Sequence, residues 1–396
     1  MLAALLIRAK RALHRTWQRA AMWFRQRFLS KAALRDDGAD SVATPDFEPA
    51  QPVKAEIVAH TAPDATVPTS ARWLEGTAKN ADGRIPWVLT PPERNYRLYI
   101  PAVNIENRPL LVMIHGCRQD AAAFAEATRM NALADAHGFA VLYPDQTEVA
   151  NMHRCWNWFE TETLAGRGEV AILLTMIDRA VKRAGADAEN VVVAGLSSGG
   201  ALAALLAFSY PERFSSVAVH SGLAPHAADT VTSALAAMRD GADLDIAALT
   251  KRYWREHQLP PPPLLVVHGD ADDRVHSKNA DQLFDLWASL NQAETTDPLP
   301  RMQHDFTAAL SQRAYRTTSI TARQSAPDRH DTHNTQGFKL AEGVRIEGLQ
   351  HAWSGGNAAL PFNDALGPDA SKLIVAFARL DQANSGQYIA ADSLLE

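Results

Sequence analysis

The pentapeptide Gly195-Leu196-Ser197-Ser198-Gly199 places a serine between small residues, at the junction of two apolar runs. The run at 190–194 predicts a buried strand and residues 199–210 predict a helix. A strand, a tight turn and a helix project the Ser197 hydroxyl from a sharp corner, the arrangement called a nucleophile elbow. The Ser198 N–H then points to where negative charge develops on an attacked carbonyl. We therefore predict Ser197 as a nucleophile, against the alternative that this common motif occurs by chance.

A serine nucleophile needs a histidine to take its proton and an acid to orient that histidine, in the chain order Ser, acid, His. The strand predicted at 343–349 leads into a glycine-rich loop that holds His351. Three other histidines also end strand-like runs, but they fit the required order or role less well: His115, His220 and His268. We predict His351 as the base.

The acid is predicted in the loop that follows the strand at 263–268. Three aspartates lie there: Asp270, Asp272 and Asp273. Ligands of open α/β sheets bind beyond the carboxyl ends of the strands, which favours an acid at this place. A loop aspartate is alone more often a turn former, so the residues themselves leave the choice among the three open.

A second oxyanion donor is predicted after the strand at 109–115. Gly116 permits a close backbone approach, and the N–H of Cys117 is the natural partner of the Ser198 N–H. The alternative is an ordinary strand-to-helix turn.

These segments together resemble the polyhydroxybutyrate depolymerase family of esterases, which has the α/β-hydrolase fold and is related to feruloyl and acetylxylan esterases. The resemblance runs from about residue 72 to residue 371. Its motifs are His115-Gly116-Cys117 with Gln119, Cys155-Trp156-Asn157-Trp158-Phe159, Gly195-Leu196-Ser197-Ser198-Gly199-Gly200, His268-Gly269 with Asp272 and Val275, and Gly348-Leu349-Gln350-His351-Ala352-Trp353-Ser354-Gly355-Gly356.

The resemblance implies a catalytic triad of Ser197, Asp272 and His351, with the N–H groups of Cys117 and Ser198 as the oxyanion hole. It selects Asp272 from the three aspartates by the family spacing. The chain departs from the family at Ser198, where alanine is common, and at Ser354, where proline is frequent. No cofactor and no metal are expected for this chemistry.

The resemblance also implies substrate-binding residues and a cross-link. Trp156, Trp158, Trp353 and Gln119 are the expected substrate contacts, although tryptophans also commonly fill cores. Cys117 and Cys155 are expected to form a disulfide, with two reduced, buried thiols as the alternative.

The expected substrate is poly(3-hydroxybutyrate) or its oligomers. The alternative is a feruloyl or acetylxylan ester. A non-catalytic binding protein on a hydrolase scaffold is the alternative from another class, and it predicts a missing triad residue. We expect no nucleic-acid partner.

Composition and periodicity indicate an α/β fold with a mostly parallel central sheet flanked by helices. The 396 residues are 46% apolar, enough for one large core and an extension. Strand patterns alternate with helical ones, as in parallel sheets wrapped by helices. The strands are predicted at 95–101, 109–115, 138–144, 190–196, 215–221, 263–268 and 343–349, and the helices at 121–137, 170–185, 199–210 and 370–383. The catalytic domain is predicted at 71–385, with a probable insertion at 294–338 and a tail at 386–396.

Residues 1–35 carry nine basic side chains and no acid, whereas the whole chain has a net charge of −6. Apolar and basic residues fall on opposite sides of a helical wheel, which predicts an interfacial amphipathic helix. A flexible linker is predicted at 36–70. We expect residues 1–35 to bind an anionic membrane or an intracellular polyester granule; packing on the acidic body of the same chain is the alternative.

The same residues bear on localisation. The apolar run at 2–7 is short and precedes the charges, unlike a secretory signal. No segment approaches the length needed to span a bilayer. A cytoplasmic protein at a granule or membrane surface is therefore favoured, with a periplasmic or secreted protein as the alternative.

Overall fold

A computed structural model describes residues 70–79, 93–103, 105–291, 313–321 and 339–382. All of these residues lie within the second of the two units into which the chain divides, 64–396. The leader helix predicted at 1–35, the tail predicted at 386–396 and, apart from Ser70, the linker predicted at 36–70 lie outside the described residues.

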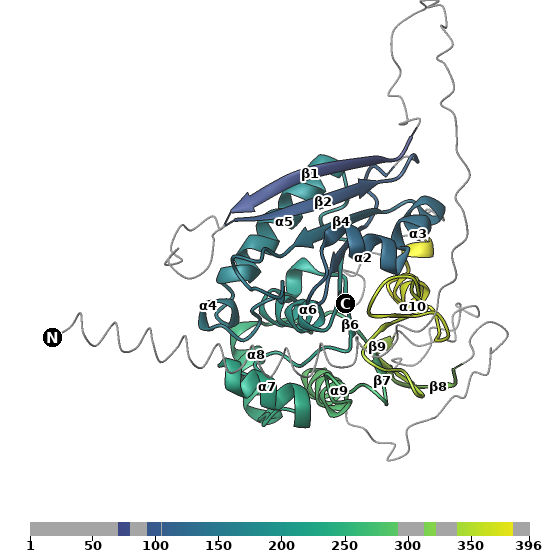
Figure 1. The fold of residues 1–396 in the computed structure, drawn as a ribbon. Helices are drawn as coiled ribbons and strands as arrows, with labels where there is room; N and C mark the ends of the chain where they lie inside the picture. Colours follow the sequence, from purple (N-terminus) through teal and green to yellow (C-terminus); the bar gives the residue numbers. More distant parts are fainter. Residues whose placement is uncertain (1–69, 80–92, 104, 292–312, 322–338, 383–396) are drawn as a thin grey trace, which may run out of the picture. The chain divides into compact units, whose positions relative to one another are not determined.

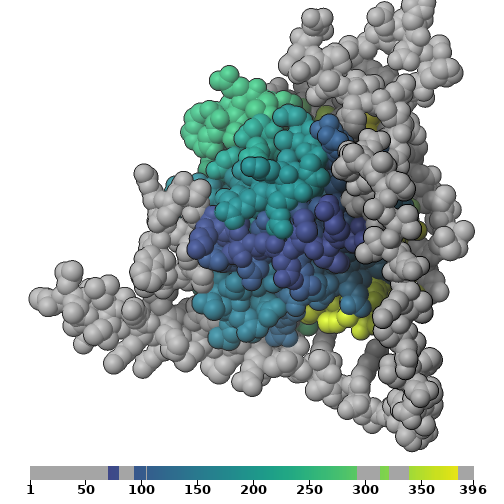
Figure 2. All heavy atoms as spheres, turned by 90° about the horizontal axis from the view of Figure 1, so that it is seen from above, coloured from purple at the N-terminus to yellow at the C-terminus, as the bar shows by residue number. Residues whose placement is uncertain are grey.

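Nine of the described strands build one twisted central sheet in the order β1-β2-β4-β3-β5-β6-β7-β9-β8 (Figure 1). The strands from β4 to β9 in this order are parallel, whereas β1, β2 and β8 pair antiparallel at the two edges. Figure 2 views the molecule from the β1 side, so the purple atoms of this edge strand face the viewer. The strands are β1 (Arg72–Lys79), β2 (Glu93–Ile100), β3 (Leu110–Ile114), β4 (Ala140–Asp145), β5 (Val191–Leu196), β6 (Ser216–His220), β7 (Leu264–Gly269), β8 (Tyr315–Thr321) and β9 (Lys339–Ile346).

Helices cover both faces of the sheet because its inner strands are apolar on both sides. In β3, Leu110, Val112 and Ile114 face one core, while Leu111 and Met113 face the other. The first core is covered by α4 (Thr161–Leu164), α5 (Gly168–Ala184), α6 (Ser198–Ser209), α7 (Val231–Asp240), α8 (Ile246–Glu256) and α9 (Lys278–Leu290). The second core is covered by α2 (Ala121–Thr128), α3 (Met130–His137) and α10 (Ala370–Phe377). None of the described helices combines the length and apolarity needed to cross a membrane.

The predicted α/β-hydrolase fold, with its mostly parallel sheet between helices, is confirmed for the described residues. All seven predicted strands correspond to strands of the sheet, although β9 begins and ends before the predicted 343–349. The single helix predicted at 121–137 is two helices, because Arg129 has a φ of 53° and interrupts the helical backbone.

The segment predicted as an insertion, 294–338, is described only at 313–321. There it contains β8, which pairs antiparallel with β9 as an edge strand of the main sheet. This part of the segment therefore belongs to the core architecture. A short parallel pair, β10 (Trp353–Ser354) with β11 (Asn363–Asp364), follows the loop that holds His351.

The end of β3, the end of β5 and the start of α6 meet at the turn between β5 and α6, and two glycines there have no space for a side chain. A Cβ at Gly195 would lie 2.3 Å from the Gly199 carbonyl oxygen. A Cβ at Gly199 would lie 2.2 Å from the oxygen of Ile114 and 2.5 Å from that of His115. Only glycine allows the start of α6 to approach the end of β3 this closely.

We expect Gly199→Ala to lower the free energy of unfolding by about 2–3 kcal/mol, because the added methyl meets backbone atoms that cannot move aside. Gly343→Ala is the matched control, since an added Cβ there lies 3.4 Å from a Phe284 ring carbon. Urea unfolding of both variants measures the difference. Equal stability of the two would contradict the close approach.

Candidate active site

Ser197 occupies a strained turn at the end of β5. Its φ of 58° and ψ of −119° lie in a region that residues with a Cβ seldom adopt. Such a backbone costs about 1–3 kcal/mol and persists only where its surroundings hold it. Here the Ser197 N–H donates to the His220 carbonyl on β6, at 2.9 Å. The serine side chain is thereby held at the carboxyl end of the sheet, as the pentapeptide predicts.

Asp272 lies in the loop after β7 and contacts His351 directly. Its Oδ2 accepts a hydrogen bond from His351 Nδ1 at 2.8 Å, and its Oδ1 accepts from the N–H groups of Arg274 and Val275 at 2.9 Å each. Burial by itself raises the pKa of Asp272, but His351 and the other donors outweigh it and hold the pKa well below its usual range. The carboxylate is therefore charged and fixed in orientation.

The other two candidate aspartates have different partners. Asp270 Oδ1 accepts from the Gly348 N–H at 2.7 Å, and exposed Asp273 pairs with Arg274 at 3.4 Å. Asp272 is thus the one of the three that the structure brings to His351. Because His351 Nδ1 is engaged by Asp272, Nε2 is the ring nitrogen that can take up a proton.

The Cys117 loop lies against the serine. A Cβ at Gly116 would be 3.4 Å from the Ser197 Cβ. Cys117 forms a disulfide with Cys155, with a Cα–Cα distance of 4.2 Å. Within the described part of the chain, no hydrogen-bond acceptor engages the N–H of Cys117 or that of Ser198. Both N–H groups thus remain available to an oxyanion formed beside Ser197.

The four expected substrate contacts are buried. Trp156 and Trp353 are 0% exposed, Trp158 is 4% exposed and Gln119 is 5% exposed. Their polar atoms bond within the protein: Trp156 Nε1 donates to the His115 carbonyl and Gln119 Oε1 accepts from the Gly116 N–H. Their burial differs from the expected contact with substrate, because these side chains are enclosed by the protein around them.

Two histidines other than the predicted base support the site. His268 Nε2 donates to the Val275 carbonyl at 2.9 Å and lies 3.5 Å from Asp272 Oδ2, so it holds the acid loop. His220 stacks on Trp353 with ring centroids 5.1 Å apart, and its Nε2 accepts from the Ser354 N–H. Their positions at strand ends were the available signal, but that signal does not distinguish a supporting histidine from a base.

The site is built without a recognisable metal cluster: among the described residues, no three His, Cys, Asp or Glu side chains are grouped to hold an ion. The chemistry that the arrangement can perform is proton transfer and nucleophilic attack by side chains, with charge stabilised by backbone N–H groups.

The buried histidines predict a pH dependence of stability. Burial lowers the pKa of His220 to about 3 and that of His268 to about 4, whereas unfolded histidines titrate near 6.5. Below that pH the unfolded chain binds more protons, so the contribution of these groups is complete above about pH 6.5 and is lost as the pH falls towards 4.

We therefore expect the free energy of unfolding to fall between about pH 6.5 and pH 4, and His268→Gln to make that slope shallower by up to about 1.4 kcal/mol per pH unit. Glutamine keeps an N–H donor for the Val275 carbonyl but cannot take up a proton. Urea unfolding across this pH range measures both slopes. An unchanged slope in the variant would mean that His268 does not stay neutral in the folded protein.

Comparison with known proteins places this geometry in a family. A family model described as esterase PHB depolymerase matches residues 94–297. The chain is 32% identical over 202 residues to poly(3-hydroxyalkanoate) depolymerase C of Paucimonas lemoignei, covering 50% of this chain and 49% of that protein. It is 26% identical over 214 residues to feruloyl esterase B of Neurospora crassa, covering 52% of this chain and 72% of that protein.

The fold has a counterpart among solved structures. Acetyl xylan esterase from Aspergillus awamori superposes with a TM-score of 0.56 at 18% identity, over 78% of this chain and 99% of that one. The chain spans about half the length of the Paucimonas lemoignei depolymerase. Since the family model covers more than half of this chain, including the Cys117 loop, Ser197 and Asp272, the chain belongs to the esterase PHB depolymerase family.

Proposed function

We propose that this chain is a serine carboxylic-ester hydrolase in which Ser197 is the nucleophile, His351 the general base and Asp272 the acid that orients the base. The observation that carries the proposal is the 2.8 Å hydrogen bond from His351 Nδ1 to buried Asp272, at the sheet edge where Ser197 occupies its strained turn. A complete set of the three residue types argues against a non-catalytic binding protein.

In the proposed reaction His351 Nε2 takes the Ser197 hydroxyl proton as the oxygen attacks the ester carbonyl. The resulting oxyanion accepts from the N–H groups of Cys117 and Ser198, and Asp272 stabilises the imidazolium that forms. His351 then gives its proton to the leaving alcohol, leaving an acyl group on Ser197. Water, deprotonated by the same histidine, attacks the acyl group; the acid product departs and the serine regains its proton.

We propose a short-chain polyhydroxyalkanoate, poly(3-hydroxybutyrate) or its oligomers, as the substrate class. The 32% identity to poly(3-hydroxyalkanoate) depolymerase C supports this choice. A feruloyl or acetylxylan ester is the second candidate, supported by the similarity to feruloyl esterase B and to acetylxylan esterase A of Aspergillus oryzae, which is 24% identical over 203 residues.

Ser197→Ala is expected to lower the rate of p-nitrophenyl butyrate hydrolysis by a factor of about 10⁶, because the variant cannot form the acyl-enzyme. Ser215→Ala is the matched control, since the Ser215 hydroxyl bonds Asn190 and Val191 at the opposite end of the strands. A fluorophosphonate probe should label the wild type and the control but not Ser197→Ala. Substantial turnover by Ser197→Ala would exclude this serine as the nucleophile.

A side-by-side assay separates the two substrate classes. We expect the protein to release acid from amorphous poly(3-hydroxybutyrate) granules or 3-hydroxybutyrate oligomers with a higher kcat/KM than from methyl ferulate or acetylated xylan. Titration of the released acid reports all four reactions on one scale, with Ser197→Ala as the blank. Preference for methyl ferulate or acetylated xylan would move the assignment to the second candidate while leaving the serine mechanism intact.

A further inference from the structure

A buried ion pair lies behind the Cys117 loop. Arg94 Nη2 on β2 is 2.9 Å from Glu169 Oε1 on α5, and the two side chains are 0% and 1% exposed. Two charges removed from water need further hydrogen bonds on their remaining polar atoms. Gln146 supplies them, since its Oε1 accepts from Arg94 Nε and its Nε2 donates to Glu169 Oε1 at 2.5 Å. The two charges therefore determine which way the Gln146 amide points.

The backbone of Gln146 in turn fixes the proton on His115. The Gln146 N–H donates to His115 Nε2 at 3.1 Å, and a ring nitrogen that accepts a hydrogen bond carries no proton. Asp145 Oδ1 lies 3.9 Å from the same nitrogen, too far to accept from it. Burial lowers the pKa of His115 and favours the neutral ring. The proton of His115 is thus on Nδ1.

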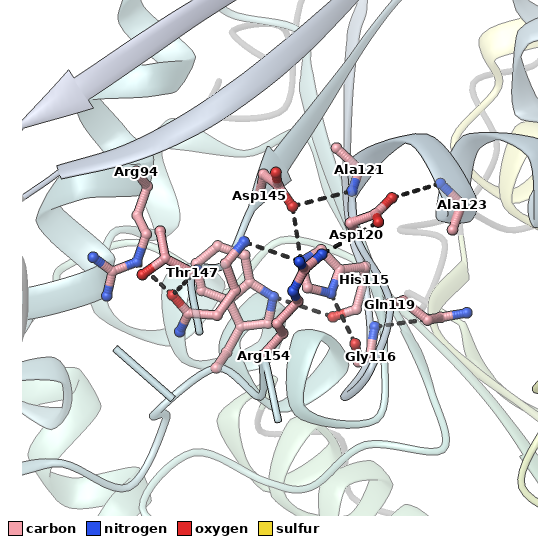
Figure 3. A network of polar contacts seen from close by, with 12 residues as sticks. Arg94, His115, Gly116, Gln119, Asp120, Ala121, Ala123, Asp145, Thr147 and Arg154 are labelled. Atoms are coloured by element: carbon pink, nitrogen blue, oxygen red, sulfur yellow. Dashed lines mark hydrogen bonds and ion pairs between the residues drawn. The ribbon is translucent and has the colours of Figure 1, made fainter. Parts of the chain in front are cut away.

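His115 Nδ1 uses that proton to hold the next peptide group. It donates to the Gly116 carbonyl oxygen at 2.8 Å, and the Gln119 N–H donates to the same oxygen at 3.3 Å. Figure 3 shows His115 between Asp145 and Gly116, with Gln119 beyond. In a trans peptide the C=O and N–H point in opposite directions. Holding the Gly116 oxygen on the His115 side therefore turns the Cys117 N–H away from His115.

The side-chain amide of Gln146 also holds Cys155, the residue at the other end of the disulfide. Gln146 Nε2 also donates to the Cys155 carbonyl at 3.0 Å, and Glu169 Oε2 accepts from the Asn157 N–H at 2.7 Å. Between these two anchored residues, the Trp156 N–H donates to Ser198 Oγ at 3.3 Å. One buried network thus reaches both Cys117, through its disulfide, and Ser198.

We propose that His115 and Gln146 are positioning residues that aim the Cys117 N–H at the oxyanion, with the Arg94–Glu169 pair fixing Gln146. Neither side chain touches the substrate. The mechanism requires one tautomer of His115, with the proton on Nδ1 and a bare Nε2. This inference rests on the proposed ester hydrolysis, since the oxyanion is the species that the N–H group would bind.

Two substitutions of His115 separate its two nitrogens. Asparagine places an N–H donor near the Nδ1 position, whereas glutamine reaches the Nε2 position and leaves the Gly116 oxygen without this donor. We expect His115→Gln to lower kcat for p-nitrophenyl butyrate roughly 10- to 100-fold with little change in KM, less than the about 10²- to 10³-fold cost of deleting an oxyanion donor. His115→Asn should recover most of that loss.

Inhibitor binding distinguishes positioning from general damage. A trifluoromethyl ketone that adds to the serine forms an oxyanion, so its affinity should fall in His115→Gln in parallel with kcat, while KM for p-nitrophenyl butyrate stays nearly unchanged. Tyr210→Phe is the matched control, because it removes a 2.9 Å hydrogen bond to the Gly166 carbonyl outside this network. Equal kcat and equal ketone affinity in wild type and His115→Gln would overturn the proposal.

A measurement on the unmutated full-length protein is independent of activity. Nitrogen-15 NMR of histidine-labelled protein should show several rings with a protonated Nδ1 and an unprotonated Nε2 at neutral pH, among them His220, whose Nε2 also accepts a hydrogen bond. One of these signals should be absent from His115→Asn. The signal that disappears in His115→Asn identifies the His115 ring. If that ring has a protonated Nε2 or is an imidazolium in the wild type, the inference is wrong. Failure of the proposed function is recognised separately, as a wild-type protein with this tautomer that hydrolyses no ester.

Discussion

The unusual backbone of Ser197 is the constraint around which the rest of the site is arranged. A residue at φ 58° and ψ −119° would relax if its neighbours gave way. It is held by the His220 carbonyl on one side and by the contact of Gly199 with the last carbonyls of β3 on another. The strands β3, β5 and β6 must therefore keep their register for the serine to keep its orientation.

The strand order explains why residues far apart in the chain meet here. β3, β5, β6, β7 and β9 are neighbours in that order, and all are parallel, so their carboxyl ends lie along one edge of the sheet. Ligands of such sheets bind at this edge. Supporting histidines follow the same rule, because His115, His220 and His268 each stand at or beside a strand end. The sheet thus places the polar groups of the site along one edge.

Much of this arrangement follows from the sequence, because strand patterns and the Ser197 turn are local properties of the chain. The seven predicted strands are of this kind, whereas the choice of Asp272 as the partner of His351, 79 residues away, follows from the resemblance to the esterase family. The direction in which a buried side chain points depends on the packing of elements that are distant in sequence. For that reason the sequence does not reveal that Trp156 and Trp353, which are expected at the substrate, lie in the cores. Likewise, no local pattern links Arg94 to Glu169, since 75 residues separate them.

The disulfide between Cys117 and Cys155 separates two demands on one residue. In the proposed mechanism the backbone N–H of Cys117 serves the chemistry, and an N–H is present in every residue except proline. The side chain takes no direct part in the chemistry and acts only through the disulfide that anchors the loop. Natural selection can therefore tune the rigidity of this loop through the identity of residues 117 and 155 while the donor itself is inherited unchanged. An exchange at position 117 therefore keeps the donor itself and changes how firmly the loop holds it.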